Sequence, residues 1–266
     1  MPTAVPEIQL LQASIDKEGE SHFRFLIDNK SIKYIVTDAG LYSVDDMCFA
    51  PALIPLLPVF PTGNWNDGHI ARNSGTGQPC FARVTRKQLP SVSHSWHATR
   101  VDYLELAMQK KLRSKVYEAT SARFDSTVVA KFARFFWEIP FLNAETVAYQ
   151  WIEGRGIAPE FLGHLTEEGR VIGFLMERIT DGHHASPKDL SSCQEILSKL
   201  HRLGIKHGDI NKHNFIIHDG RANLLDFECA RKCEDREILG EEFEMLAERL
   251  GDTSGRGGSE VVDSGS

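Results

Sequence analysis

Three oxygen-bearing side chains lie close together in the last quarter of the chain: Asp209, Asn214 and Asp226. Asp209 and Asn214 follow an apolar helical stripe, and Asp226 follows two short apolar segments joined by Asp219-Gly220. An Asp-Gly pair between apolar segments predicts a two-residue hairpin turn. A loop at a helix end followed by this hairpin would bring the three side chains to one edge of a sheet. Their oxygens are the ligands that Mg²⁺ prefers.

Such an arrangement suits phosphoryl transfer from a nucleotide. That reaction needs one carboxylate near the acceptor hydroxyl, one further oxygen ligand for Mg²⁺, and a second carboxylate that links the metal to the phosphates. The segments that carry the three residues are His207-Gly208-Asp209, followed by Asn214, and Asp226-Phe227-Glu228. These motifs resemble those of the protein-kinase-like superfamily, and within it the aminoglycoside and choline phosphotransferase branch. That branch has Gly where protein kinases favour Arg, and it often has Glu in place of the final Gly.

The resemblance implies an α+β, two-lobed kinase-like fold, with an antiparallel N-lobe sheet and a shortened helical C-lobe. It also extends towards the N-terminus. Val128-Val129-Ala130-Lys131 is similar to the strand whose lysine grips the nucleotide phosphates, and Glu145 to the helix glutamate that orients this lysine, with Glu153 as the alternative. Phe174–Ile179 resembles the last N-lobe strand and the hinge, where the backbone of Glu177 and Ile179 would meet adenine.

The implied mechanism is in-line transfer of the ATP γ-phosphoryl group to a hydroxyl of a small molecule or a protein. Asp209 would orient and deprotonate the acceptor, Asn214 and Asp226 would bind Mg²⁺, and Lys131 held by Glu145 would position the phosphates. The alternative is a pseudokinase that acts as a nucleotide-binding or protein-interaction module. Clustered carboxylates, which repel one another without a cation, favour the active enzyme.

Two departures from the family pattern favour the alternative. The position of the glycine-rich loop is taken by Lys110–Lys115, which holds Ser114 and four basic residues. These bases could steady phosphates or form a solvated turn, and we favour the solvated turn. The stretch after Glu228 has room for only one or two helices, so we expect a reduced substrate side, completed by the N-terminal hundred residues or by a protein partner.

The remaining segments define the expected organisation. Residues 1–100 form an accessory region with a hairpin (22–27 and 31–37) and a proline-punctuated stretch unsuited to regular helix, and 62–95 receive no element. Residues 101–250 form the kinase-like domain, with strand pairs at 116–120/127–132 and 161–165/170–179. Its helices follow a cap at Asn143, start at Ser186-Pro187, and carry Leu239 to Leu250. The tail, 251–266, is expected to be disordered.

Composition excludes several classes of partner. The net charge of −7 disfavours nucleic acid, because a binder needs an excess of Lys and Arg to displace counterions. No apolar run approaches the roughly 20 residues that span a bilayer. The N-terminus lacks the features of a secretory signal, so we expect a cytoplasmic protein without membrane contact.

Overall fold

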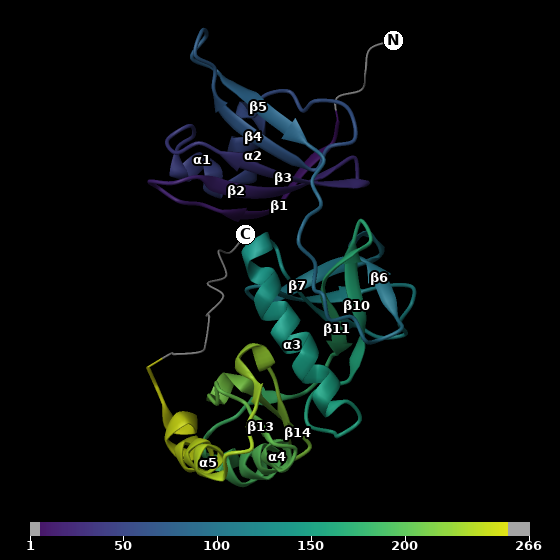
Figure 1. Cartoon of the computed structure of the whole chain (residues 1–266), viewed down its shortest axis with the longest axis vertical. Helices are drawn as coiled ribbons and strands as arrows, with labels where there is room; N and C mark the ends of the chain where they lie inside the picture. Colours follow the sequence, from purple (N-terminus) through teal and green to yellow (C-terminus); the bar gives the residue numbers. More distant parts are fainter. Residues whose placement is uncertain (1–5, 255–266) are drawn as a thin grey trace. The chain divides into compact units, whose positions relative to one another are not determined.

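The chain divides into two compact units, Met1–Leu89 and Pro90–Ser266, in a computed structural model that describes residues 6–254 (Figure 1). Residues 90–100 lie in the second unit, where Val92 is buried in the core and the Trp96 ring packs 4.7 Å from that of Phe161. Residues 255–266 of the predicted tail fall outside the described part. Within that part, every helix is too short or too polar to cross a bilayer.

The first unit is built on a five-stranded sheet in the order β1-β2-β3-β4-β5. The predicted hairpin is confirmed as β2 (Ser21–Ile27) and β3 (Ser31–Thr37), and Asp28 and Asn29 adopt the left-handed conformation in its turn. The other strands are β1 (Ile8–Ser14), β4 (Asp67–Arg72) and β5 (Pro79–Thr85). β3 and β4 run parallel and the other neighbours antiparallel. β4 and β5 lie in the stretch that received no element.

The proline-punctuated stretch forms short helical turns, contrary to the expectation that helix is unsuited there. They are α2 (Ala50–Leu53) and the 3₁₀ turn η1 (Ile54–Leu56), and α1 (Val44–Cys48) precedes them. Pro51 and Pro55 stand in the first turn of α2 and η1, where the missing N–H has no helical acceptor to lose. Side chains of this stretch join the aromatic core of the first unit, which contains Phe23, Phe25 and Trp65.

The second unit begins with a six-stranded sheet in the order β6-β10-β11-β9-β8-β7. All neighbours are antiparallel except β6 and β10. The strands are β6 (Arg100–Asp102), β7 (Ala107–Arg113), β8 (Val116–Thr120), β9 (Val128–Phe132), β10 (Phe161–Glu167) and β11 (Arg170–Glu177). Both predicted strand pairs are confirmed.

Helix α3 (Ile139–Ile152) packs against this sheet (Figure 1). It begins before Asn143, so the predicted cap at that residue is wrong. Asn143 lies inside the helix, and its side-chain oxygen accepts hydrogen bonds from the backbone N–H groups of Ser93 and His94. An Asn before an apolar stripe can cap the helix or bond to a distant segment, and here it bonds to the backbone of residues 93–94.

The six-stranded sheet and α3 form one lobe of the second unit. The other lobe contains α4 (Leu190–Arg202) and α5 (Arg236–Gly251), which pack side by side (Figure 1). Ser186 caps the 3₁₀ turn that opens α4, and Gly204 adopts the left-handed conformation after it, as predicted. Its short strands are β12 (His183–His184), β13 (Ile205–Lys206), β14 (Phe215–His218), β15 (Arg221–Leu224) and β16 (Arg231–Lys232). The second unit thus has the predicted two-lobed kinase-like α+β fold, and the first is its β-containing N-terminal extension.

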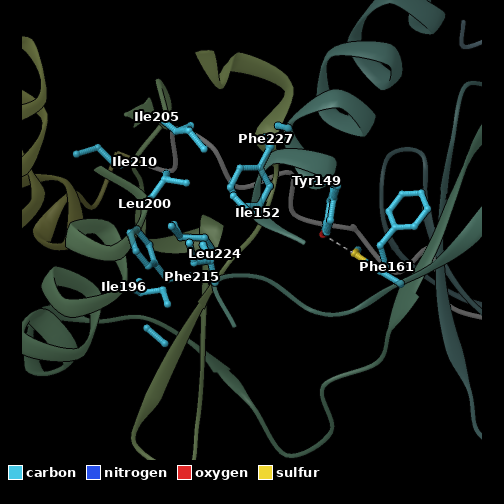
Figure 2. Close-up of a cluster of buried hydrophobic side chains, with 14 of the residues drawn as sticks. Tyr149, Ile152, Phe161, Ile196, Leu200, Ile205, Ile210, Phe215, Leu224 and Phe227 are labelled. Carbon is cyan, nitrogen blue, oxygen red and sulfur yellow. Dashed lines mark hydrogen bonds between the residues drawn. The ribbon is translucent and has the colours of Figure 1, made fainter. Parts of the chain in front are cut away.

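One apolar cluster runs through both lobes of the second unit (Figure 2). Tyr149 of α3 packs against Phe174 of β11 and against Phe227, which follows β15, with ring centroids 5.0 and 5.5 Å apart. The Tyr149 hydroxyl donates to the sulfur of Met176 at 3.2 Å. Because Phe227 directly follows Asp226, this stack joins the core to the predicted metal-binding turn.

Two adjacent residues of α5 test the assignment of its buried face. Leu246 is fully buried, whereas Met245 is 39% exposed. We expect Leu246→Ala to lower the free energy of unfolding by about 2–5 kcal/mol, because it leaves a cavity in a close-packed core. Met245→Ala, the matched control, should change it by less than about 0.5 kcal/mol. Urea unfolding followed by circular dichroism measures both, and equal effects would contradict the assigned face.

Candidate functional site

The loop that carries Asp209 and Asn214 leaves β13 and turns sharply at Gly208. Gly208 has φ +85°, and a Cβ there would lie 2.6 Å from the carbonyl oxygen of Cys229, so only glycine fits. The Asn214 amide nitrogen donates to Asp209, to its carbonyl oxygen at 2.9 Å and to Oδ2 at 3.0 Å. The predicted catalytic carboxylate and the first predicted metal ligand are therefore in direct contact.

His207 supports this loop from inside. It is fully buried, its ring lies 5.1 Å from that of Phe227, and its Nε2 lies 3.0 Å from the carbonyl oxygen of Leu225. Burial lowers the pKa of His207, which keeps the imidazole neutral. The contacts indicate a packing role within the loop.

Asp226 lies two residues after β15 in a left-handed backbone conformation, with φ 63° and ψ 70°. The N–H of the preceding Leu225 donates to the carbonyl oxygen of Asn214 at 2.9 Å, which joins the Asp226 turn to the Asp209 loop. On its other side, the N–H of Phe227 donates to Glu145 Oε1 at 3.3 Å. Burial raises the pKa of Asp226, but the nearby Lys131 outweighs it and holds the pKa below its usual value.

Lys131 is the centre of an ion cluster. Its Nζ lies 2.7 Å from Glu145 Oε2, 2.8 Å from Asp226 Oδ1 and 3.2 Å from Glu228 Oε1. Lys131 and Glu145 are both buried, whereas Glu153, the alternative partner, is exposed at the end of α3. Burial raises the pKa of Glu145 to about 7. Burial alone would lower the pKa of Lys131, but the three carboxylates raise it, so the ammonium stays charged.

A cavity of about 470 Å³ opens beside this cluster. Val116 and Val129 of the sheet line it, as do Ile216 and Leu225 of the other lobe, so apolar side chains from both lobes border it. Glu177 and Ile179, the predicted hinge residues, also line the cavity, as do Lys131, Glu145 and Asp226. The cavity volume and its mixed apolar and charged lining suit a small ligand that carries charge. Asp209 and Asn214 are not among the lining residues. Arg113, which lines the cavity, contacts the loop that carries them.

The basic hairpin is not the solvated turn that we favoured. β7 and β8 meet at Ser114-Lys115, and both Arg113 and Lys115 line the cavity. The Lys115 ammonium lies 3.0 Å from Glu228 Oε1. The Arg113 guanidinium donates to the carbonyl oxygen of His213 in the Asp209 loop. Lys110 and Lys111, earlier on β7, are exposed, so only the end of the basic run faces inward.

Glu242 of α5 is a site residue that sequence reasoning missed. Its carboxylate is buried and accepts hydrogen bonds from the N–H groups of His207 at 3.0 Å and Gly208 at 2.6 Å. His201 Nε2 lies 2.8 Å from the same carboxylate. Three contacts on one carboxylate fix the loop just before Asp209. In the sequence, Glu242 is one of several acidic residues on an amphipathic helix, and nothing distinguishes it.

The pKa of Glu242 makes this anchor sensitive to acid. Burial raises this pKa, but the hydrogen bonds from His201, Gly208 and His207 outweigh it, so the pKa lies below its usual value. A lowered folded-state pKa adds stability above the unfolded value of about 4.3, and this contribution disappears as the pH falls through the folded value. Glu242→Gln should lower the free energy of unfolding at pH 7 by about 1–3 kcal/mol and flatten its pH dependence below about pH 5. Urea unfolding at pH 4–7 measures this, with the exposed Glu241→Gln as control, and an unchanged pH slope would contradict it.

Comparisons with known proteins give short partial matches. No family model matches the chain. A probable bifunctional tRNA threonylcarbamoyladenosine biosynthesis protein of Methanospirillum hungatei is 38% identical over 69 residues, 26% of this chain and 13% of that protein. Proteins of the same description match from Methanoculleus marisnigri, 28% identical over 85 residues (32% of this chain, 15% of the relative), and Methanocorpusculum labreanum, 36% over 58 (22% and 11%). The chain thus has partial similarity to a tRNA-modification protein and covers well under two thirds of it.

Proposed function

We propose that the chain is an ATP- and Mg²⁺-dependent phosphotransferase that transfers the γ-phosphoryl group to a hydroxyl. The observation that carries the proposal is Lys131, which is held between Glu145 and Asp226 and lines a cavity with both apolar and charged walls. An ammonium with three carboxylates around it is costly to bury as a mere structural device. It is well suited to hold the phosphates of a nucleotide whose base lies in the apolar part.

The cavity fits the nucleotide in this proposal. The adenine would lie between the two pairs of apolar side chains, with its edge towards the backbone of Glu177 and Ile179. The phosphates would then extend towards Lys131 and Asp226. Backbone groups at the hinge would recognise the base, and the apolar walls would exclude water from it.

The residues present also fit Mg²⁺. The Asn214 amide nitrogen donates to Asp209, and this fixes the orientation of the amide and leaves Oδ1 on the opposite side. Asn214 Oδ1 has only a 3.5 Å contact, from Arg113. Asn214 and Asp226 would hold the ion, with the carboxylate of Glu228 near that of Asp226. Bound there, Mg²⁺ would neutralise charge on the phosphates.

Asp209 would act on the acceptor. Its side chain is exposed, and Oδ2 accepts hydrogen bonds from the amides of Asn211 and Asn214, which orient the carboxylate. In the proposed step, the acceptor oxygen bonds to the γ-phosphorus, Asp209 takes the hydroxyl proton, and the bond to the β-phosphate oxygen breaks to release ADP. Positioning and charge stabilisation would supply most of the rate enhancement.

The three partial matches favour a place for this activity beside tRNA modification, since the relatives are described as threonylcarbamoyladenosine biosynthesis proteins. The chain carries a net charge of −7, which disfavours tRNA as a direct ligand. We therefore propose that a protein partner completes the substrate side. The alternative acceptor is a small molecule, as the resemblance to small-molecule phosphotransferases implies.

A second candidate is a pseudokinase, which the missing glycine favours: the turn that lines the cavity is Ser114-Lys115. Nucleotide binding without turnover would agree with it. The retained set of Lys131, Asp209 and Asp226 favours the enzyme.

Thermal unfolding with and without nucleotide tests the binding step. MgATP at 100 times its dissociation constant should stabilise the protein by about 2.7 kcal/mol. The shift should require both Mg²⁺ and ATP, and Asp226→Asn should abolish it, because the variant lacks a carboxylate that holds the metal. Asp219→Asn, in an exposed turn that also has a positive φ, is the matched control and should behave as wild type. Absence of a shift in the wild type would argue against both candidates' use of a nucleotide.

Turnover separates the two candidates. Asp209→Asn should keep the MgATP-dependent shift but lower ATP turnover by about 10²–10⁴-fold, because it removes the proton acceptor and keeps the shape. Release of ADP, measured by a coupled assay, reports this without knowledge of the natural acceptor, because water takes the phosphoryl group when no other hydroxyl is supplied. Wild-type binding with no turnover above the Asp209→Asn level would favour the pseudokinase, whereas turnover unaffected by Asp209→Asn would contradict the role of Asp209.

A further inference from the structure

The β7–β8 hairpin ends over the cavity and brings two cations there, with different surroundings. The Lys115 ammonium has a carboxylate partner, Glu228, at 3.0 Å. Lys131 has three carboxylates. Arg113, in contrast, has no carboxylate within 4.0 Å among the residues that the structure describes. Its guanidinium contacts neutral groups, namely the carbonyl oxygen of His213, Asn214 Oδ1 at 3.5 Å and His184 Nε2 at 3.4 Å. The carboxylates of Asp226 and Asp209 attract it only from beyond contact distance.

These contacts leave Arg113 poorly satisfied. Two of the three are at or near the outer limit of a hydrogen bond, and a guanidinium offers five N–H donors. The side chain is partly buried and lines the cavity. A cation removed from water is costly unless an anion or several good acceptors compensate it. An anion that enters the cavity would provide this compensation.

The chemistry of the guanidinium selects the kind of anion. Its planar fork binds phosphate oxygens in pairs, which an ammonium cannot do. The hairpin occupies the place where a glycine-rich loop would cover the phosphates with backbone N–H groups, and it has no glycine to allow that close approach. A side chain with several N–H donors can supply the same hydrogen bonds from farther away.

We propose that Arg113 binds the β- and γ-phosphates of the nucleotide and so replaces the backbone donors of a glycine-rich loop. The inference rests on the proposed function and deepens it. When a triphosphate binds, Arg113 exchanges its weak contacts with Asn214 and His184 for phosphate oxygens. That exchange also frees Asn214 Oδ1 for the metal.

Isothermal titration of the full chain in the presence of Mg²⁺ tests the role of Arg113 with three ligands: ATP, inorganic tripolyphosphate and adenosine. Arg113→Ala should weaken binding of ATP and tripolyphosphate about 10- to 100-fold, because a charge-assisted bidentate contact is lost. Adenosine binding should change less than about twofold. Arg113→Lys should give an intermediate loss, since it keeps the charge but not the fork. Lys111→Ala, exposed on the same strand, is the matched control and should match the wild type.

The outcomes separate this inference from the proposed function. ATP binding that is equal in the wild type and Arg113→Ala overturns the role of Arg113 and leaves the proposed function intact. An equal loss for ATP and adenosine indicates a structural role and also overturns it. A wild type that binds neither ATP nor tripolyphosphate overturns both. If Arg113→Ala does not fold, the comparison of Arg113→Lys with the wild type decides by the same criteria.

Discussion

The buried ion cluster at Lys131 is the interaction on which the arrangement of the site depends. Its members come from β9, α3 and the turn after β15, so electrostatic attraction holds three distant segments in one place. Lys115 pairs with Glu228 from the other side, which still leaves three carboxylates against two ammonium groups in a partly buried region. Such a cluster is stable only while each member has its partners, since a buried charge that loses its counter-ion costs several kcal/mol. The geometry is therefore sharply defined, and a cation or a phosphate-bound metal nearby would relieve the excess.

Two further contacts extend this order to the loop of Asp209. Tyr149 and Phe227 stack within the apolar core of both lobes (Figure 2), and the N–H of Phe227 donates to Glu145 of the ion cluster. Glu242 fixes the backbone of His207 and Gly208 from the other side. Asp209 thus lies between a helix that anchors its loop and a hairpin turn bonded to Asn214. The mobile parts of the proposed reaction would be the ligands and the side chain of Arg113, while the carboxylates stay in place.

The fold and the central residues could be predicted because their signals are local. Asp209, Asn214 and Asp226 lie within one short stretch of the chain around an Asp-Gly turn, and the strand that carries Lys131 is a run of adjacent apolar residues. Contacts between distant segments could not be predicted. In the sequence, Glu242 is one acidic residue among many, and only the structure shows that the Asp209 loop donates to it. Asn143 has the sequence context of a helix cap, but its side chain accepts from the distant Ser93. The sequence of β7 is basic throughout, and only the hairpin geometry separates Arg113, which faces the cavity, from the exposed Lys111. β4 and β5 were missed because their polar, turn-rich segment lacks clear alternation.

The left-handed backbone at Asp226 limits how this position can change during evolution. A β-branched or bulky residue would be strained there whatever its side chain offered, whereas Gly, Asn and Asp accept this conformation at small cost. Among these three, Asp alone supplies a charged oxygen. Under the proposed function, selection for a metal-binding carboxylate and selection for the bend act on the same residue, and a lineage that lost metal binding would be expected to drift first to Asn or Gly. The identity of this residue in other members of the lineage would then record whether the site is still in use.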